Sequence, residues 1–123
     1  MRILTLVIYA LFGAGAILGG IAAVVSPSVI LPSTELTPLA RHLAREEGAA
    51  FVFIGGMLLW AARHYDRRRP VHLGMVVLTA LFAAIHWQGY FESGRYASAG
   101  LVNTVPFVLF ALTTPFSRDR AVH

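Results

Sequence analysis

No charged residue lies between Arg2 and Glu35, and this uncharged stretch limits the possible folds more than any other feature of the chain. Within it, the apolar run from Ile3 to Val25 is long enough to cross a hydrocarbon core, which needs about 20 helical residues. A signal peptide has a shorter apolar region of about 7–15 residues before a small-residue cleavage site. Because the run is longer and Val24-Val25-Ser26-Pro27 makes a poor cleavage site, we expect a retained membrane-spanning helix.

The composition agrees with a membrane protein. Hydrophobic residues make up 57% of the 123 residues, charged residues make up 13%, and the mean hydropathy is +0.68. Soluble domains carry about 25% charged residues, and disordered chains are poor in apolar residues, so both classes are excluded. The chain has no cysteine, which excludes disulfides, iron–sulfur clusters and thiol chemistry.

Three further apolar segments follow the first run. Thr37 is a suitable N-cap and Pro38 suits the first helical position, so a helix is predicted to start there, with its first turns at the membrane surface. We expect a single transmembrane domain over residues 1–123, with spans at about 3–25, 46–65, 71–91 and 97–116. The outer loop, residues 26–45, includes the surface start of the second span. Short connections favour antiparallel neighbours, which predicts an all-α integral membrane four-helix antiparallel bundle.

The arginines predict the direction of the bundle, because cytoplasmic loops are enriched in basic residues. All ten basic residues are arginines. Three fall on the predicted outer side, among most of the acidic residues, and they are Arg41, Arg45 and Arg95. The others fall on the opposite side, and they are Arg2, Arg63, Arg67, Arg68, Arg69, Arg118 and Arg120. Both termini are therefore expected in the cytoplasm.

The same arginines account for the pI of about 10.4. An arginine-rich rim at the inner surface attracts anionic lipid, so we expect the bilayer and its anionic lipids as partners. The run from Arg67 to Arg69 is too short for nucleic-acid binding and has no aromatic stacking partners, so no nucleic-acid partner is expected.

Small residues predict where helices pack, because they let backbones approach closely in lipid. The first span carries a stripe of small residues spaced four apart, Gly15, Gly19 and Ala23, and the second span contains Gly55 and Gly56. The stripe fits either a contact within the chain or a contact with another subunit, including self-association through the first span.

His86 is the main candidate for a functional side chain, because an ionisable group inside a membrane span is costly to bury. One interpretation is a neutral imidazole that bonds across to Asn103 or Thr104. The others are a ligand-contacting or proton-handling group, or an axial ligand to haem or chlorin. No second histidine matches it for a two-histidine haem site, since His64 and His72 lie near the inner surface.

A polar pocket on the outer side is a further hypothesis, and it needs several side chains at similar depth. Its tentative ligand-binding residues are Glu46, Glu47, His86, Gln88 and Asn103. The alternative for the two glutamates is an interfacial salt-bridge collar. No ligand spacing typical of a metal site is present, and no catalytic motif is recognisable, so neither a metal nor an enzymatic activity is expected.

From about Ala40 to Pro115 the chain resembles the DoxX-like group of small bacterial four-helix membrane proteins. The matching features are Arg45-Glu46-Glu47-Gly48, Gly55-Gly56, the arginine-rich inner loop, and a late histidine followed by Gly89-Tyr90-Phe91. The resemblance implies a helical bundle in a bacterial inner membrane that is an accessory part of a larger membrane assembly. It carries over no catalytic residue. We therefore expect a non-catalytic accessory or scaffold subunit of a respiratory or photosynthetic type of complex. The alternative is a small-molecule or lipid carrier that uses the pocket around His86.

Overall fold

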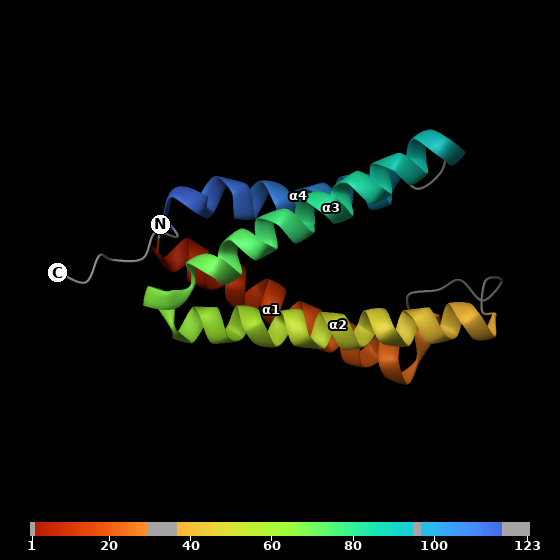
Figure 1. The fold of residues 1–123 in the computed structure, drawn as a ribbon, viewed down its shortest axis with the longest axis horizontal. Helices are drawn as coiled ribbons and strands as arrows, with labels where there is room; N and C mark the ends of the chain where they lie inside the picture. The colour runs from red at the N-terminus through yellow and green to blue at the C-terminus, as the bar shows by residue number, and fades with distance from the viewer. Residues whose placement is uncertain (1, 30–36, 95–96, 117–123) are drawn as a thin grey trace. The chain divides into compact units, whose positions relative to one another are not determined.

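The computed structural model describes residues 2–29, 37–94 and 97–116. These residues form four α-helices and no strand, which confirms the predicted all-helical fold (Figure 1). The helices are α1 (Arg2–Val25), α2 (Pro38–Arg63), α3 (Arg69–Ser93) and α4 (Ala97–Thr113). Short 3-10 turns are η1 (Pro27–Val29), η3 (Tyr65–Arg67) and η4 (Thr114–Phe116).

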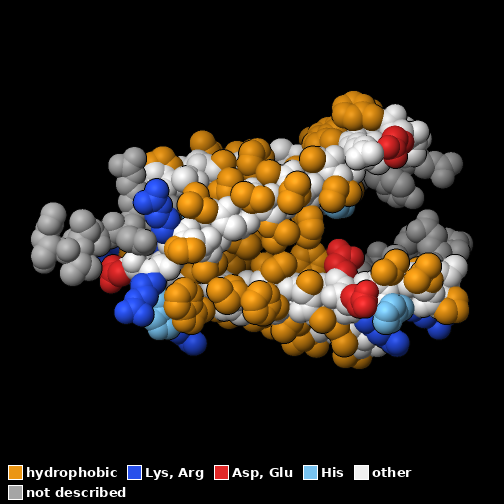
Figure 2. Space-filling view, viewed as in Figure 1, with side chains coloured by type: hydrophobic (Ala, Val, Ile, Leu, Met, Phe, Trp, Pro, Cys, Tyr) orange, Lys and Arg blue, Asp and Glu red, His pale blue; other side chains and the backbone are white. Residues whose placement is uncertain are grey.

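The chain divides into two compact units, which are described separately. The N-terminal unit is Leu6–Arg63, and it holds most of α1 together with η1 and α2. The C-terminal unit is His64–His123 together with Met1–Thr5, so the first residues of α1 belong to it. In both units hydrophobic side chains cover the middle of the helices and charged side chains gather toward the helix ends (Figure 2).

Among the described helices, α1 and α3 are long and apolar enough to cross a membrane. α4 is also apolar but has only 17 residues. α2 has 26 residues, and its first turns carry charged side chains, so its apolar part starts only at Gly48. Two of the four expected spans therefore have the required length and composition as single helices.

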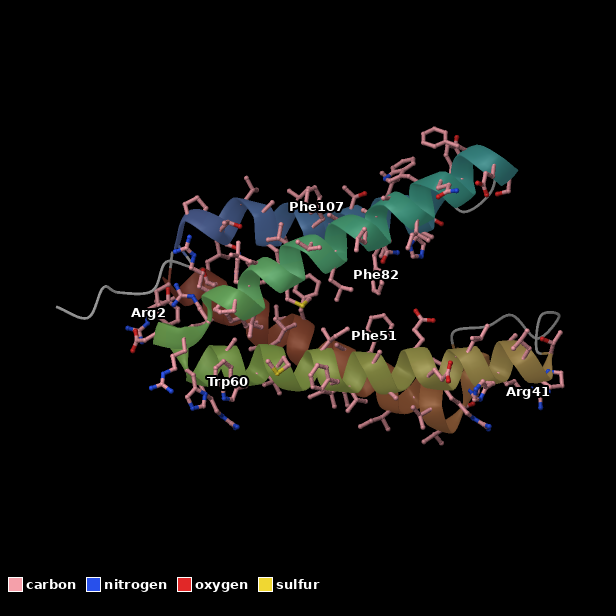
Figure 3. The ribbon with its side chains drawn as sticks, viewed as in Figure 1. Arg2, Arg41, Phe51, Trp60, Phe82 and Phe107 are labelled. Atoms are coloured by element: carbon pink, nitrogen blue, oxygen red, sulfur yellow. The ribbon has the colours of Figure 1, made fainter. Side chains whose placement is uncertain are left out.

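The ends of α2 and α3 follow from local sequence signals. The Thr37 hydroxyl accepts a hydrogen bond from the backbone N–H of Ala40 at 3.1 Å, which confirms the predicted N-cap. α2 then runs without a break to Arg63, with Arg41 and Trp60 toward its opposite ends (Figure 3). α3 ends at Gly94, whose φ of 65° is a left-handed conformation that glycine adopts without a steric penalty.

In the N-terminal unit, α1 and α2 are antiparallel and touch through four glycines, which we call the glycine seam: Gly13, Gly20, Gly48 and Gly55. Gly13 faces Gly55, and Gly20 faces Gly48. The two glycines on each helix are one heptad apart, so both return to the same side of their helix. A Cβ built on Gly20 would lie 2.5 Å from the carbonyl oxygen of Gly48, and one built on Gly55 would lie 2.5 Å from that of Gly13. The seam therefore brings backbone against backbone.

Candidate functional site

The residues predicted for an outer polar pocket fall in both units, so the structure places them in two groups. Glu46 lies in the N-terminal unit, and its carboxylate is 3.2 Å from Nε2 of His42, one turn earlier on α2; both side chains are exposed. Glu47 is also exposed. Gln88 lies in the C-terminal unit and donates a hydrogen bond of 2.8 Å to Glu92 on the surface of α3. A single pocket that contains residues of both groups stays a prediction.

His86 bonds to its own helix. Its Nδ1 lies 2.8 Å from the carbonyl oxygen of Phe82, one turn back on α3. Because a carbonyl oxygen only accepts, Nδ1 carries the hydrogen, and in the neutral ring Nε2 keeps its lone pair. Asn103 likewise donates to the carbonyl of Ala99 on α4, at 2.9 Å. The hydrogen bond between α3 and α4 that was one interpretation of His86 is made by a neighbouring side chain.

That neighbour is Trp87. Its indole N–H donates a hydrogen bond to the Thr104 hydroxyl at 2.9 Å. The Thr104 hydroxyl in turn donates a hydrogen bond to the carbonyl oxygen of Gly100 at 2.8 Å. The indole ring also packs on Gly100, where an added Cβ would lie 3.1 Å from the ring. Trp87 therefore attaches α3 to α4 by both a hydrogen bond and a flat contact on a glycine.

At the other end of the same helix pair, His72 is completely buried. Its Nε2 lies 2.9 Å from the carbonyl oxygen of Phe110 and 3.2 Å from the Thr114 hydroxyl. The Nε2–H therefore donates to α4, and the ring meets the Phe110 ring edge-on at 5.7 Å between centroids. The sequence analysis placed His72 only near the inner surface. The structure buries it in a contact between α3 and α4.

A group of cationic and aromatic side chains lies next to His72. Arg68 is 1% exposed, and its guanidinium donates to the carbonyl of Tyr65 at 2.6 Å. The guanidiniums of Arg68 and Arg2 lie 3.0 Å and 4.6 Å from the centre of the Tyr65 ring. Cations over an aromatic face are attracted by its negative quadrupole. Arg2 thereby connects the start of α1 to the turn before α3.

These side chains join neighbouring elements to one another. We call them the inner cluster, which consists of Arg2, Tyr65, Arg68, His72, Phe110 and Thr114. Its donors are held by carbonyl, hydroxyl and aromatic groups of neighbouring elements. Within the described ranges no group of three or more His, Asp or Glu side chains could hold a metal ion. Sequence reasoning missed the cluster because it read Arg68 only as a loop charge. The signal that could have found it is the spacing of Arg68 and His72, which places both on one face of a helix.

The predicted packing residues separate into two sets. Ala23 and Gly55 lie in the contact between α1 and α2, since Ala23 is 1% exposed and a Cβ on Gly55 would meet α1. Gly15, Gly19 and Gly56 are exposed, and a Cβ added at any of them would meet nothing within 4 Å in the part of the chain that the structure describes. Contact with another chain therefore remains the prediction for the stripe at Gly15 and Gly19.

α1 thus has two different faces. Successive helical residues are about 100° apart, so Gly13 and Gly20 lie on the face against α2, while Gly15 lies nearly opposite. The side chains next to Gly15 on that opposite side are exposed as well. We call this the exposed face of α1, and it consists of Leu11, Gly15, Leu18 and Gly19.

No protein-family model, curated protein or solved structure matches this chain. The residues themselves therefore carry the functional argument.

Proposed function

We propose that this protein is a small polytopic membrane protein that serves as a non-catalytic accessory or scaffold subunit. The single observation that carries the proposal is the pair of opposite faces on α1, because one face is used by the glycine seam and the other is smooth and exposed. Small residues four apart promote close helix contact in lipid. The exposed face would bind a helix of a larger membrane subunit, or a second copy of α1.

The proposed topology has four membrane spans and places both termini in the cytoplasm. The apolar α1 and α3 support it, as do the apolar but shorter α4 and the large exposed hydrophobic side chains on these helices. Residues such as Val77, Leu81 and Leu112 would then face lipid acyl chains. The arginines near η3 would lie at the inner surface, where they would attract anionic lipid.

The DoxX-like resemblance supports the same class of role, and a bacterial inner membrane is the location that we propose with it. The partner would be a helical membrane complex of the respiratory or photosynthetic type. In this role the inner cluster holds the start of α1 against the C-terminal unit, and no residue of the chain needs to react.

The test is affinity purification in mild detergent, followed by mass spectrometry, of the wild-type chain and of the double variant Gly15→Leu/Gly19→Leu. We expect a stoichiometric larger membrane partner with the wild type and its loss with the double variant. Gly74→Leu is the matched control, because Gly74 is exposed on α3 and has open space around it. A partner that survives the double variant, or a chain that purifies alone, would contradict the proposal.

A second candidate is a small-molecule or lipid carrier that binds around His86. The observation in its favour is the hydrogen bond from Nδ1 to Phe82, which leaves Nε2 as the acceptor or ligating nitrogen. Ligating histidines are commonly oriented by such a bond from the other nitrogen. A lone homo-oligomer that retains a metabolite, lipid or pigment, and loses it with His86→Gln, would favour this candidate over the scaffold.

A further inference from the structure

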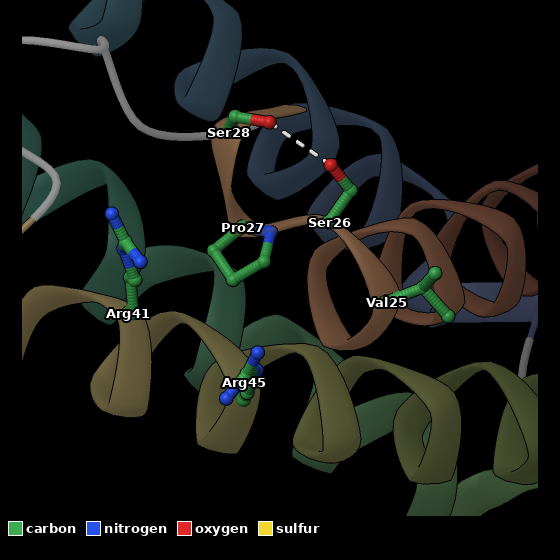
Figure 4. Close-up of a pocket in the computed structure, with 6 residues that line it drawn as sticks. All are labelled: Val25, Ser26, Pro27, Ser28, Arg41 and Arg45. Carbon is green, nitrogen blue, oxygen red and sulfur yellow. Dashed lines mark hydrogen bonds between the residues drawn. The ribbon is translucent and has the colours of Figure 1, made fainter. Parts of the chain in front are cut away.

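A small pocket lies in the N-terminal unit where α1 ends and α2 begins. It has a volume of about 220 Å³ and is lined by residues from the end of α1, from η1 and from the start of α2 (Figure 4): Val25, Ser26, Pro27, Ser28, Arg41 and Arg45. Sites for drug-sized ligands measure about 300–1,000 Å³. This pocket therefore suits a small polar group.

The lining combines two cations with two hydroxyls. Arg41 and Arg45 are one turn apart on α2, and both line the pocket (Figure 4). The hydroxyls of Ser26 and Ser28 lie 2.9 Å apart, and Pro27 between them is buried. Hydroxyls and guanidiniums all donate hydrogen bonds to an anionic oxygen.

Phosphate is the anion that matches this set best. The planar guanidinium fork of arginine fits the oxygens of a phosphate group. Two like charges one turn apart also destabilise a helix, and an anion between them would remove that repulsion. Glu46 and Glu47 follow directly in the sequence but do not line the pocket, and Glu46 lies against His42.

The position of the pocket favours a lipid as the source of the phosphate. Val25, which lines the pocket, is 75% exposed, and Val29, which follows Ser28 in η1, is 63% exposed. The uncharged run of α1 ends at Val25, and the charged start of α2 lies beside it. In a membrane this is the boundary between hydrocarbon and headgroups, where a phosphate would meet the arginines while acyl chains cover the valines.

We propose that this pocket binds the phosphate of a phospholipid headgroup, through the guanidiniums of Arg41 and Arg45 and the hydroxyls of Ser26 and Ser28. The lipid source rests on the membrane location in the proposed function. A free phosphate ion has the same chemistry and could enter the same pocket from solution. The site is separate from the arginine-rich inner rim, because it lies at the opposite end of α2 from Arg63.

The test uses a fluorophore at Val29, the residue that follows the lining residue Ser28 in the chain. The chain has no cysteine, so Val29→Cys can be labelled alone with an environment-sensitive dye on the full chain in neutral detergent. The probes are dihexanoyl-phosphatidylglycerol, dihexanoylglycerol, which lacks the phosphate, and inorganic phosphate. We expect a saturable response to phosphatidylglycerol and none to dihexanoylglycerol.

The variant Arg41→Gln/Arg45→Gln should raise the phosphatidylglycerol midpoint by about tenfold or more, because charge-assisted hydrogen bonds are lost. The matched control, Arg63→Gln/Arg67→Gln, removes the same charge from two exposed arginines, one at the other end of α2 and one in η3, and should leave the midpoint unchanged. An unchanged midpoint in the first variant, or an equal response to dihexanoylglycerol, would overturn the proposal. Circular dichroism checks that each variant folds.

If the glutamine pair does not fold, Arg41→Lys/Arg45→Lys tests the same point. This variant keeps the positive charges but removes the planar guanidinium groups, so we expect the phosphatidylglycerol midpoint to rise several-fold. An unchanged midpoint would contradict the assigned contacts. A saturable response to inorganic phosphate that the arginine variant abolishes would support the phosphate site with a free anion as its source. This assay needs no partner protein, so a failed purification of a partner would refute the scaffold role and leave the pocket standing.

Discussion

The N-terminal and C-terminal units join their helices by different means. In the N-terminal unit, the glycine seam brings the backbones of α1 and α2 together, and the space for a single Cβ is missing at Gly20, Gly48 and Gly55. In the C-terminal unit, α3 reaches α4 with ring N–H groups, from His72 at one end and from Trp87 toward the other.

The difference shows two ways to hold helices together, and both suit the membrane location that we propose. Lipid removes the hydrophobic force between helices, so close van der Waals contact and hydrogen bonds must replace it. A seam of backbone contacts cannot accept an added atom without moving a whole helix. A contact made by long side chains can lose one hydrogen bond and keep the rest. The two units should therefore differ in their tolerance of substitution.

The largest effect is expected for alanine in the glycine seam. Gly20→Ala or Gly55→Ala places a Cβ 2.5 Å from the facing carbonyl oxygen, so the helices must separate. Overpacking of this kind costs about 1–3 kcal/mol per site, and we expect a lower unfolding temperature by circular dichroism in detergent.

Gly56→Ala is the matched control, because Gly56 is the next residue on α2 and has open space around it. Alanine there should be neutral or stabilise the helix by about 0.5–1 kcal/mol. Equal effects at Gly55 and Gly56 would show that the seam is not as tight as described.

A smaller effect is expected in the C-terminal unit. Trp87→Phe removes the N–H donor to Thr104 but keeps an aromatic ring on Gly100. Hydrogen bonds between membrane helices average about 0.6 kcal/mol, and Thr104 still donates to Gly100, so the loss should stay near that value. A double-mutant cycle with Thr104→Val measures the coupling. Additive effects of the two substitutions would contradict a direct bond.

The N-cap of α2 should contribute a local effect of about 1 kcal/mol. Thr37→Ala removes the hydroxyl that accepts the Ala40 N–H. Hydrogen exchange should then rise in the first turn of α2 only, while Thr37→Ser should preserve the wild-type rates. Faster exchange throughout α2 with the alanine variant would speak against a purely local cap.

The smallest effect is expected for His86→Gln. The glutamine side chain is polar and of similar reach, and the hydrogen bond that His86 makes is to its own helix. We expect an unchanged fold and a change in stability below about 1 kcal/mol. A coloured wild-type protein that loses its visible absorbance with this substitution would instead identify His86 as a haem or chlorin ligand.

The sequence predicts best those features that depend on neighbouring residues in the chain. The helix start at Thr37 and Pro38 was predicted from local capping rules, and the structure confirms it. The long apolar run predicts a helix over residues 3–25, and α1 spans Arg2–Val25. Each of these is determined within one or two turns of backbone.

Features that depend on how a helix is rotated against its partner could not be predicted from the local sequence. α1 contains several glycines, and only the register with α2 places Gly13 and Gly20 in the seam and Gly15 outside it. On α3, a rotation of about 100° separates His86 from Trp87, and Trp87 makes the bond to α4. Which of two adjacent residues faces the partner is a property of the pair of helices.

The central claim is that the chain crosses a membrane four times with both ends in the cytoplasm. Because the chain lacks cysteine, single substitutions at exposed positions can be labelled one at a time: Val29→Cys, Asp66→Cys and Ser93→Cys. In spheroplasts treated with a membrane-impermeant maleimide, the account predicts labelling at positions 29 and 93, and labelling at position 66 only after the membrane is opened. Equal labelling of positions 29 and 66 in intact spheroplasts would contradict it.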